Sequence, residues 1–170
     1  RMILGYYRVG QYEDARRSMD AILKFAREFR MDNPLVDFGA AVYQPKEPVN
    51  LCYDTFGPPA AMVRGLFEYI YGVNDLKLYP HIPTGITRLE QRFPIRFGTK
   101  RIYLATIGTG QVTSVLINGS AWDSFDPVSV TLPYTDLPDN AQVVIGLGDG
   151  EPMRDPVAKL EETPFAMPAA

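Results

Sequence analysis

The spacing of hydrophobic residues changes near Gly72, and this change constrains the fold more than any other feature of the chain. Before it, apolar residues recur three and four positions apart, which is the spacing of helices packed along one face. After it, apolar and polar residues alternate, which is the spacing of half-buried strands. A run of helices followed by a run of strands is typical of α+β proteins. We therefore predict an α+β fold with a boundary near residue 73.

Three helical segments are expected before this boundary. Residues 2–9 form an apolar and aromatic stretch that ends in a turn. Residues 11–31 have the clearest helical spacing, and Pro34 excludes a longer helix because proline disfavours helical conformation in the residue before it. Residues 58–71 form the last helix, with Gly72 as its stop. These helices are too few to close a core, so we expect the chain to be a fragment of a larger protein.

Short strands at regular intervals predict an antiparallel β-sandwich after the boundary. Asn118-Gly119 is a strong signal for a two-residue hairpin turn. The residues from 149 to 170 are rich in acids and prolines, and we interpret them as a tail or linker. The expected strands are 75–79, 86–91, 94–97, 100–106, 111–117, 127–132 and 142–147.

Composition excludes several classes of function. The chain has 170 residues, a formal net charge of -3, one cysteine and one histidine. One cysteine, Cys52, excludes an internal disulfide framework, and one histidine, His81, argues against a His-rich metal centre. No apolar run approaches the ~20 residues of a membrane span, and the acidic balance gives no basic footprint for nucleic acid. We expect no metal, no cofactor, no nucleic acid and no membrane partner, and the compartment stays open.

The order of the last helix and the first strand carries a family resemblance. The stretch from Phe56 to Val73 runs directly into Leu76-Lys-Leu-Tyr-Pro-His-Ile-Pro83. This order resembles the C-terminal end of the six-hairpin glycosidases, the (α/α)6-barrel carbohydrate enzymes, over roughly residues 1–147. The resemblance implies the last barrel helices at 1–73, a C-terminal β-sandwich at 74–148 and a tail or linker at 149–170.

The resemblance also implies a function. The chain is then the C-terminal fragment of a glycoside hydrolase-like enzyme that cleaves a glycosidic bond, with a carbohydrate substrate and the remainder of the barrel as its partners. Most such enzymes use two carboxyl groups, and the general acid commonly lies in a part of the barrel that this chain lacks. We therefore expect the chain alone to be inactive. The alternative is a non-catalytic carbohydrate-binding or structural β-sandwich module.

In these enzymes the second carboxylate often comes from the long loop before the last barrel helix, which corresponds here to residues 34–57. Long loops without periodicity are usually functional or disordered. Glu47, between two prolines, is the candidate general base, and an ordinary solvated acid paired with Lys46 is the alternative. Asp54 is a candidate substrate-binding residue or a helix cap. Asp37 fits a turn former better.

Aromatic residues in and after the loop are candidates for sugar binding. Tyr43, Tyr53 and Phe56 can stack on sugar rings or pack beneath the loop. Trp122 is either a sugar-binding platform on the sandwich or a packed residue. Glu68 is expected on the surface of the last helix, paired with Arg64 four residues earlier.

Overall fold

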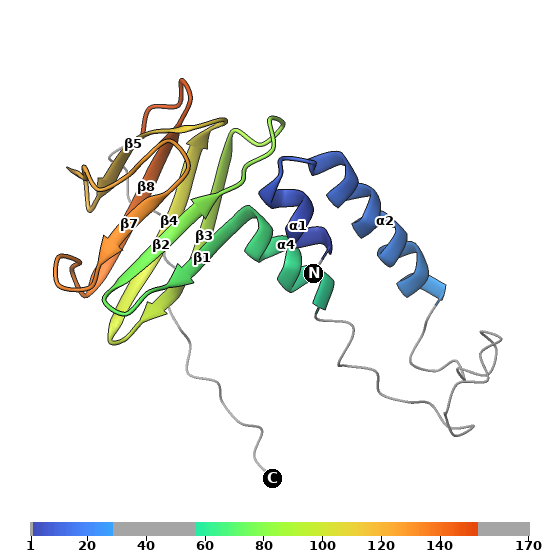
Figure 1. Ribbon diagram of the computed structural model, residues 1–170, viewed down its shortest axis with the longest axis horizontal. Coiled ribbons are helices and arrows are strands. Elements are labelled where there is room, and N and C mark those ends of the chain that lie inside the picture. The colour runs from blue at the N-terminus through green and yellow to red at the C-terminus, as the bar shows by residue number, and fades with distance from the viewer. Residues whose placement is uncertain (1, 29–56, 153–170) are drawn as a thin grey trace, which may run out of the picture. The chain divides into compact units, whose positions relative to one another are not determined.

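The computed structural model describes residues 2–28 and 57–152, and it divides the chain into two units, Arg1–Glu68 and Tyr69–Ala170 (Figure 1). The described residues form helices first and strands second, so the predicted α+β class is confirmed. The elements are α1 (Met2–Arg8), α2 (Tyr12–Glu28), α4 (Gly57–Leu66), β1 (Phe67–Tyr71), β2 (Asp75–Pro80), β3 (Arg88–Phe97), β4 (Lys100–Gly108), β5 (Val112–Ile117), β6 (Ser120–Ala121), β7 (Val130–Pro133) and β8 (Asn140–Leu147). None of the described helices is long and apolar enough to cross a membrane.

The helical unit is held by a small apolar cluster. Ile3 and Tyr7 from α1 are buried with Ala15 from α2, and Leu66 of α4 packs against them. A Cβ atom at Gly65 would lie 2.2 Å from the ring of Tyr7, so only glycine lets α4 approach α1 this closely. The first two helices, predicted from the spacing of apolar residues, are confirmed within the described residues.

A partly buried ion pair joins α1 to the end of this unit. The Arg8 Nε atom lies 3.0 Å from each carboxylate oxygen of Glu68, and Nη2 also binds Oε1. The Glu68 side chain is only 6% exposed, whereas Arg8 is 54% exposed. The hydrogen bonds that Arg8 donates to Glu68, and then the negative charge of Glu68, raise the pKa of Arg8. Glu68 itself lies in strand β1 and not on the surface of a helix, which corrects its predicted placement.

The last helix is shorter than the prediction of residues 58–71. Helix α4 ends at Leu66, and Phe67–Tyr71 continue as strand β1, paired with β2. Aromatic and β-branched residues favour strands, and a short apolar run does not by itself distinguish a helix from a buried strand. Here the hydrogen bonds to β2 make Phe67–Tyr71 a strand and not the last turns of a helix.

The resemblance to a six-hairpin glycosidase is wrong. The described helices have 7, 17 and 10 residues, and the rest of the described chain is built mainly from two sheets, so the expected barrel helices are not seen. The motif behind the resemblance lies in and just after β2, where Leu76 and Leu78 are buried and Lys77 is exposed. Any strand with one buried face requires this alternation, so it does not specify a family.

The sandwich-like part consists of a three-stranded sheet, β1-β2-β7, and a five-stranded sheet, β3-β4-β8-β5-β6 (Figure 1). The predicted β-sandwich is confirmed as a sandwich-like part with two sheets. Strands β4 and β8 run parallel, so the larger sheet is mixed and not antiparallel as predicted. The fully buried large side chains come from β2, β4, β7 and β8: Leu76, Ile102, Leu104, Thr106, Val130, Leu132, Val143, Ile145 and Leu147.

The short-range signal at Asn118-Gly119 predicted its turn correctly. Ile117 pairs with Ser120 across the predicted Asn118-Gly119 turn, where both central residues have positive φ, 50° and 81°. Nearby, the Trp122 indole N–H donates to the Thr131 carbonyl at 3.0 Å, which joins the connection after β6 to β7 of the other sheet. Trp122 is thus a half-buried edge residue whose polar atom is occupied.

We expect Ile145→Ala to lower the free energy of unfolding by about 2–5 kcal/mol, because it opens a cavity in a fully buried position of the central strand β8. Urea denaturation followed by circular dichroism measures this. Val128→Ala, at a residue that is 62% exposed, is the control and should change the value by no more than about 0.5 kcal/mol. Equal effects of the two changes would contradict the assigned core.

Candidate binding site

The site residues predicted from the long loop lie outside the described residues. They are the candidate base Glu47 and the candidate substrate-binding residues Tyr43, Tyr53, Asp54 and Phe56. Their roles stay predictions. The described residues of the sandwich offer a separate candidate site.

Four rings meet where β1 ends beside the β3–β4 hairpin, and we call Tyr69, Tyr71, Phe97 and Tyr134 the aromatic cluster. The centroids of Tyr69 and Tyr71 lie 5.8 Å apart, those of Tyr71 and Phe97 5.9 Å, and those of Phe97 and Tyr134 5.1 Å. These separations and the tilted or edge-on angles are those of favourable aromatic pairs. The cluster therefore joins strand ends from both sheets.

The turn between β3 and β4 packs against this cluster. Gly98 has a φ of 60°, and a Cβ atom there would lie 2.9 Å from the Tyr134 ring. The hydroxyl groups of Thr99 and Tyr134 lie 3.1 Å apart and share a hydrogen bond. Glycine serves two purposes here, because it adopts the left-handed conformation and leaves room for the ring.

A lysine contacts one ring of the aromatic cluster. The Lys100 Nζ atom lies 4.8 Å from the centroid of Tyr134, at cation–π distance, and donates to the Leu137 carbonyl. Lys100 is buried. The Thr99 hydrogen bond lowers the pKa of Tyr134, and the positive charge of Lys100 lowers it further.

Tyr71 is the ring best placed to meet a ligand. It is 50% exposed, and its hydroxyl group donates to the Arg96 carbonyl at 2.7 Å. One end of the side chain is thus fixed while half of its surface faces solvent. A fixed and exposed aromatic ring can stack on the apolar face of a sugar.

Tyr71 was not among the predicted site residues, because the expected helix at residues 58–71 included it. The signal that could have found it is the spacing of Tyr69 and Tyr71, two residues apart, which puts both on one face of a strand.

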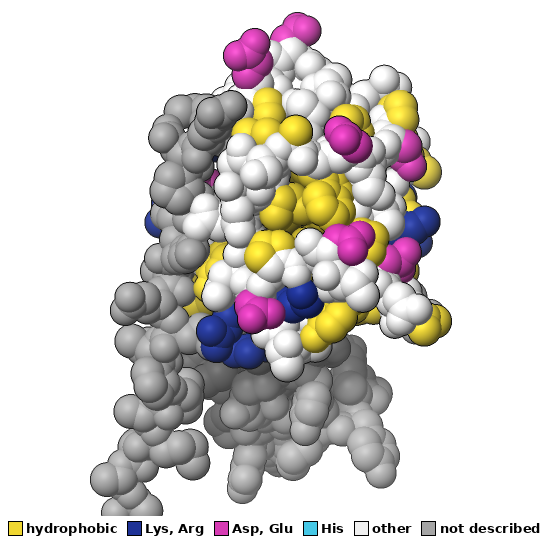
Figure 2. All heavy atoms as spheres, turned by 90° about the vertical axis from the view of Figure 1, so that its left-hand side faces the viewer, with side chains coloured by type: hydrophobic (Ala, Val, Ile, Leu, Met, Phe, Trp, Pro, Cys, Tyr) yellow, Lys and Arg dark blue, Asp and Glu magenta, His cyan; other side chains and the backbone are white. Residues whose placement is uncertain are grey.

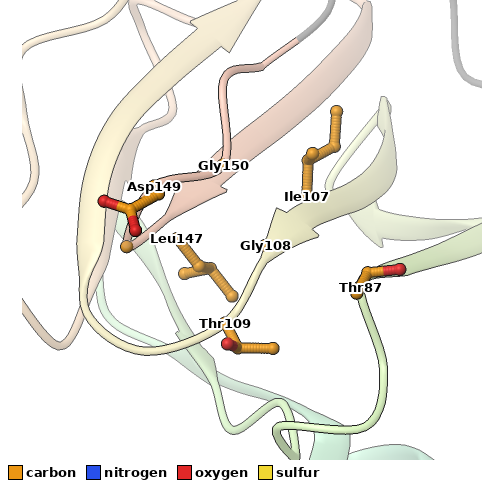
Figure 3. A pocket seen from close by; sticks show the side chains of 8 residues that line it. Thr87, Ile107, Gly108, Thr109, Leu147, Asp149 and Gly150 are labelled. Carbon is orange, nitrogen blue, oxygen red and sulfur yellow. The ribbon is translucent and has the colours of Figure 1, made fainter.

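A second feature is a shallow recess of about 410 Å³ at the far ends of β4 and β8 (Figure 3). It is lined by Thr87, Ile107, Gly108, Thr109, Leu147, Gly148, Asp149 and Gly150. Much of its wall is backbone, since a Cβ atom at Gly108 would lie 2.2 Å from the Leu147 carbonyl oxygen. In Figure 3 the Asp149 carboxylate and the Thr87 hydroxyl stand on opposite sides of the recess, so their polar atoms do not converge on one ligand.

Metal chemistry has no candidate centre in the parts of the chain that the structure describes, where no three His, Cys, Asp or Glu side chains are grouped to hold an ion. The aromatic cluster is therefore the strongest candidate site. Comparisons with known proteins add nothing to it: no family model, no curated protein and no solved structure matches the chain.

Tyrosine ionisation provides a test of the cluster. We expect Tyr134 to ionise at lower pH than an ordinary tyrosine, because Thr99 and Lys100 stabilise its phenolate. Tyr7 and Tyr12 should ionise at higher pH, because burial raises their pKa. An ultraviolet titration of phenolate absorbance measures both. Tyr134→Phe should remove the step at lowest pH, and its persistence in that variant would contradict the assignment.

The same shifts predict opposite effects of alkali on the two units. Above pH ~10, unfolded tyrosines lose protons that Tyr7 and Tyr12 keep in the folded helical unit, so its free energy of unfolding falls as pH rises. Tyr134 instead loses its proton first in the folded state, so its contribution to stability grows as pH rises from its lowered pKa towards the ordinary value. Thermal melts across this range, with Tyr7→Phe as the comparison, measure the difference.

Proposed function

We propose that the β-sandwich is a non-catalytic carbohydrate-binding module whose platform is Tyr71. The observation that supports this most is the half-exposed ring of Tyr71, anchored by its hydroxyl group to the Arg96 carbonyl. Saccharides present a flat face of C–H groups, and a tyrosine ring offers a matching apolar surface with a polar rim.

Rigidity of the platform favours binding. Tyr71 contacts Phe97, which contacts Tyr134, and Tyr134 is held by Thr99 and Lys100. A side chain that is already ordered loses little conformational entropy when a ligand stacks on it. The cluster therefore suits a ligand that offers few strong contacts, as a neutral sugar does.

Trp122, the platform considered from the sequence, suits this role less well. Its N–H group is anchored to the Thr131 carbonyl as the Tyr71 hydroxyl is to Arg96, but its ring is half-buried and less exposed than that of Tyr71. The hydrolase interpretation depends on Glu47 and its neighbours, which lie outside the described residues, and it stays a prediction. A purely structural role for the sandwich predicts that no saccharide binds.

We expect Tyr71→Ala to weaken oligosaccharide binding by about tenfold or more, because it removes the stacking surface. Isothermal titration calorimetry of the full chain against gluco-, xylo- and manno-oligosaccharides measures this. Tyr71→Phe keeps the ring but loses its anchor to the Arg96 carbonyl, so it should weaken binding less than Tyr71→Ala does.

Phe93→Ala is the matched control, because Phe93 is also an exposed ring, at 64%, and is not part of the aromatic cluster. It should leave binding unchanged. If wild-type protein binds none of these sugars, the proposal is wrong. If Phe93→Ala weakens binding as much as Tyr71→Ala, Tyr71 is not the platform.

A further inference from the structure

Asn118 and Gly119 form the turn between β5 and β6, and they are the only Asn-Gly pair in the sequence. Both residues are exposed. An asparagine before glycine is chemically labile, because glycine has no Cβ atom to keep its backbone nitrogen away from the side-chain amide carbon of the asparagine. The turn therefore combines a structural role with a reactive pair of residues.

The side chain of Asn118 is held at both ends by β8. Its carbonyl oxygen accepts the Gln142 N–H at 2.8 Å, and its amide group donates to the Asn140 carbonyl at 3.1 Å. The backbone N–H of Asn118 also donates to the Gln142 carbonyl at 3.0 Å. These three bonds continue the pairing of β5 with β8 by one residue beyond Ile117 and Val143. While they are made, the side-chain amide cannot turn toward the nitrogen of the next residue.

We propose that Asn118 is a site of spontaneous deamidation, and that the β5–β6 hairpin must separate from β8 before it reacts. In the open state the Gly119 nitrogen loses its proton to base and attacks the side-chain amide carbon of Asn118. The new C–N bond closes a succinimide ring, the bond from this carbon to the side-chain nitrogen breaks, and that nitrogen takes up a proton and leaves as ammonia. Water then opens the ring at either carbonyl and gives aspartate or isoaspartate. The reaction needs only water and base, and it does not depend on carbohydrate binding.

Neither product can rebuild the original contact with β8. Aspartate keeps an acceptor for the Gln142 N–H but loses the donor to the Asn140 carbonyl, so two acceptor oxygens face each other. Isoaspartate lengthens the main chain by one carbon and shifts the register of the hairpin against β8. Deamidation therefore makes the opening of this edge hard to reverse.

Each product also adds a negative charge to an acidic part of the chain. Residues 102–152, which include β5 to β8, contain six acids and no lysine or arginine. Figure 2 shows acidic side chains spread over the face of the molecule that it displays. Like charges repel one another, so we expect the deamidated chain to melt at a lower temperature than the original one.

Deamidation rates of the folded and the unfolded full chain test the proposal. Both samples are kept in mildly alkaline buffer, one of them with guanidinium chloride, and peptide mass spectrometry measures the conversion of Asn118. We expect conversion to be about tenfold or more slower in the folded chain, because only the open fraction reacts. Equal rates would show that β8 gives no protection, and no conversion in the unfolded chain would show that Asn118 is not a reactive site. Either result overturns the proposal.

Hydrogen exchange measures the same opening without any variant. The Asn118 N–H donates to the Gln142 carbonyl, so it exchanges when the hairpin separates from β8. Folding should slow exchange and deamidation by similar factors, because both pass through one open state. Factors that differ by more than about tenfold, in either direction, would overturn this opening as the step that controls the reaction.

A variant and an internal control test the chemistry. Gly119→Ala places a Cβ atom beside the attacking nitrogen and should slow conversion severalfold in the unfolded chain, where the positive φ of this residue no longer matters. Asn74 is exposed and precedes Asp75 instead of a glycine, so it should convert much more slowly than Asn118 in the same sample. An unchanged rate in Gly119→Ala, or equal conversion of the two asparagines, would contradict attack by the Gly119 nitrogen.

Discussion

The parallel pairing of β4 with β8 is the constraint on which the sandwich depends. These two strands fill the middle of the five-stranded sheet, and Ile102, Leu104 and Ile145 on them are fully buried. Parallel neighbours cannot be joined by a tight turn, so a long connection must lie between them. Here that connection contains β5, β6 and β7, and β7 belongs to the other sheet. The route that makes β4 and β8 parallel therefore also joins the two sheets.

This arrangement also fixes the candidate site. Once β4 is held against β8, the β3–β4 hairpin must end at Gly98 and Thr99, next to Tyr134 in the segment after β7. The three-stranded sheet brings Tyr71 to the same place from β1. The aromatic cluster is thus a result of topology, built from three segments that are far apart in the sequence.

The sequence predicted the parts of this fold that depend on neighbouring residues. The alternation of buried and exposed residues marked β2, and Asn118-Gly119 marked the hairpin between β5 and β6, because both signals are local. The end of α4 was missed because Phe67–Tyr71 is apolar enough for either a helix or a buried strand, and only pairing with β2 decides. The parallel pair was missed because no local pattern in β4 or β8 encodes the direction of its neighbour.

Protection of a sheet edge explains the arginines on strand β3. Strand β3 lies at the edge of its sheet, and it carries arginines, Pro94 and a register irregularity between Gln91 and Ile95. Natural sheets use charges, prolines and bulges at their edges to prevent pairing with other chains. This accounts for Arg92, which lies within the irregularity. It does not account for Arg101, because β4 is an interior strand paired on both sides.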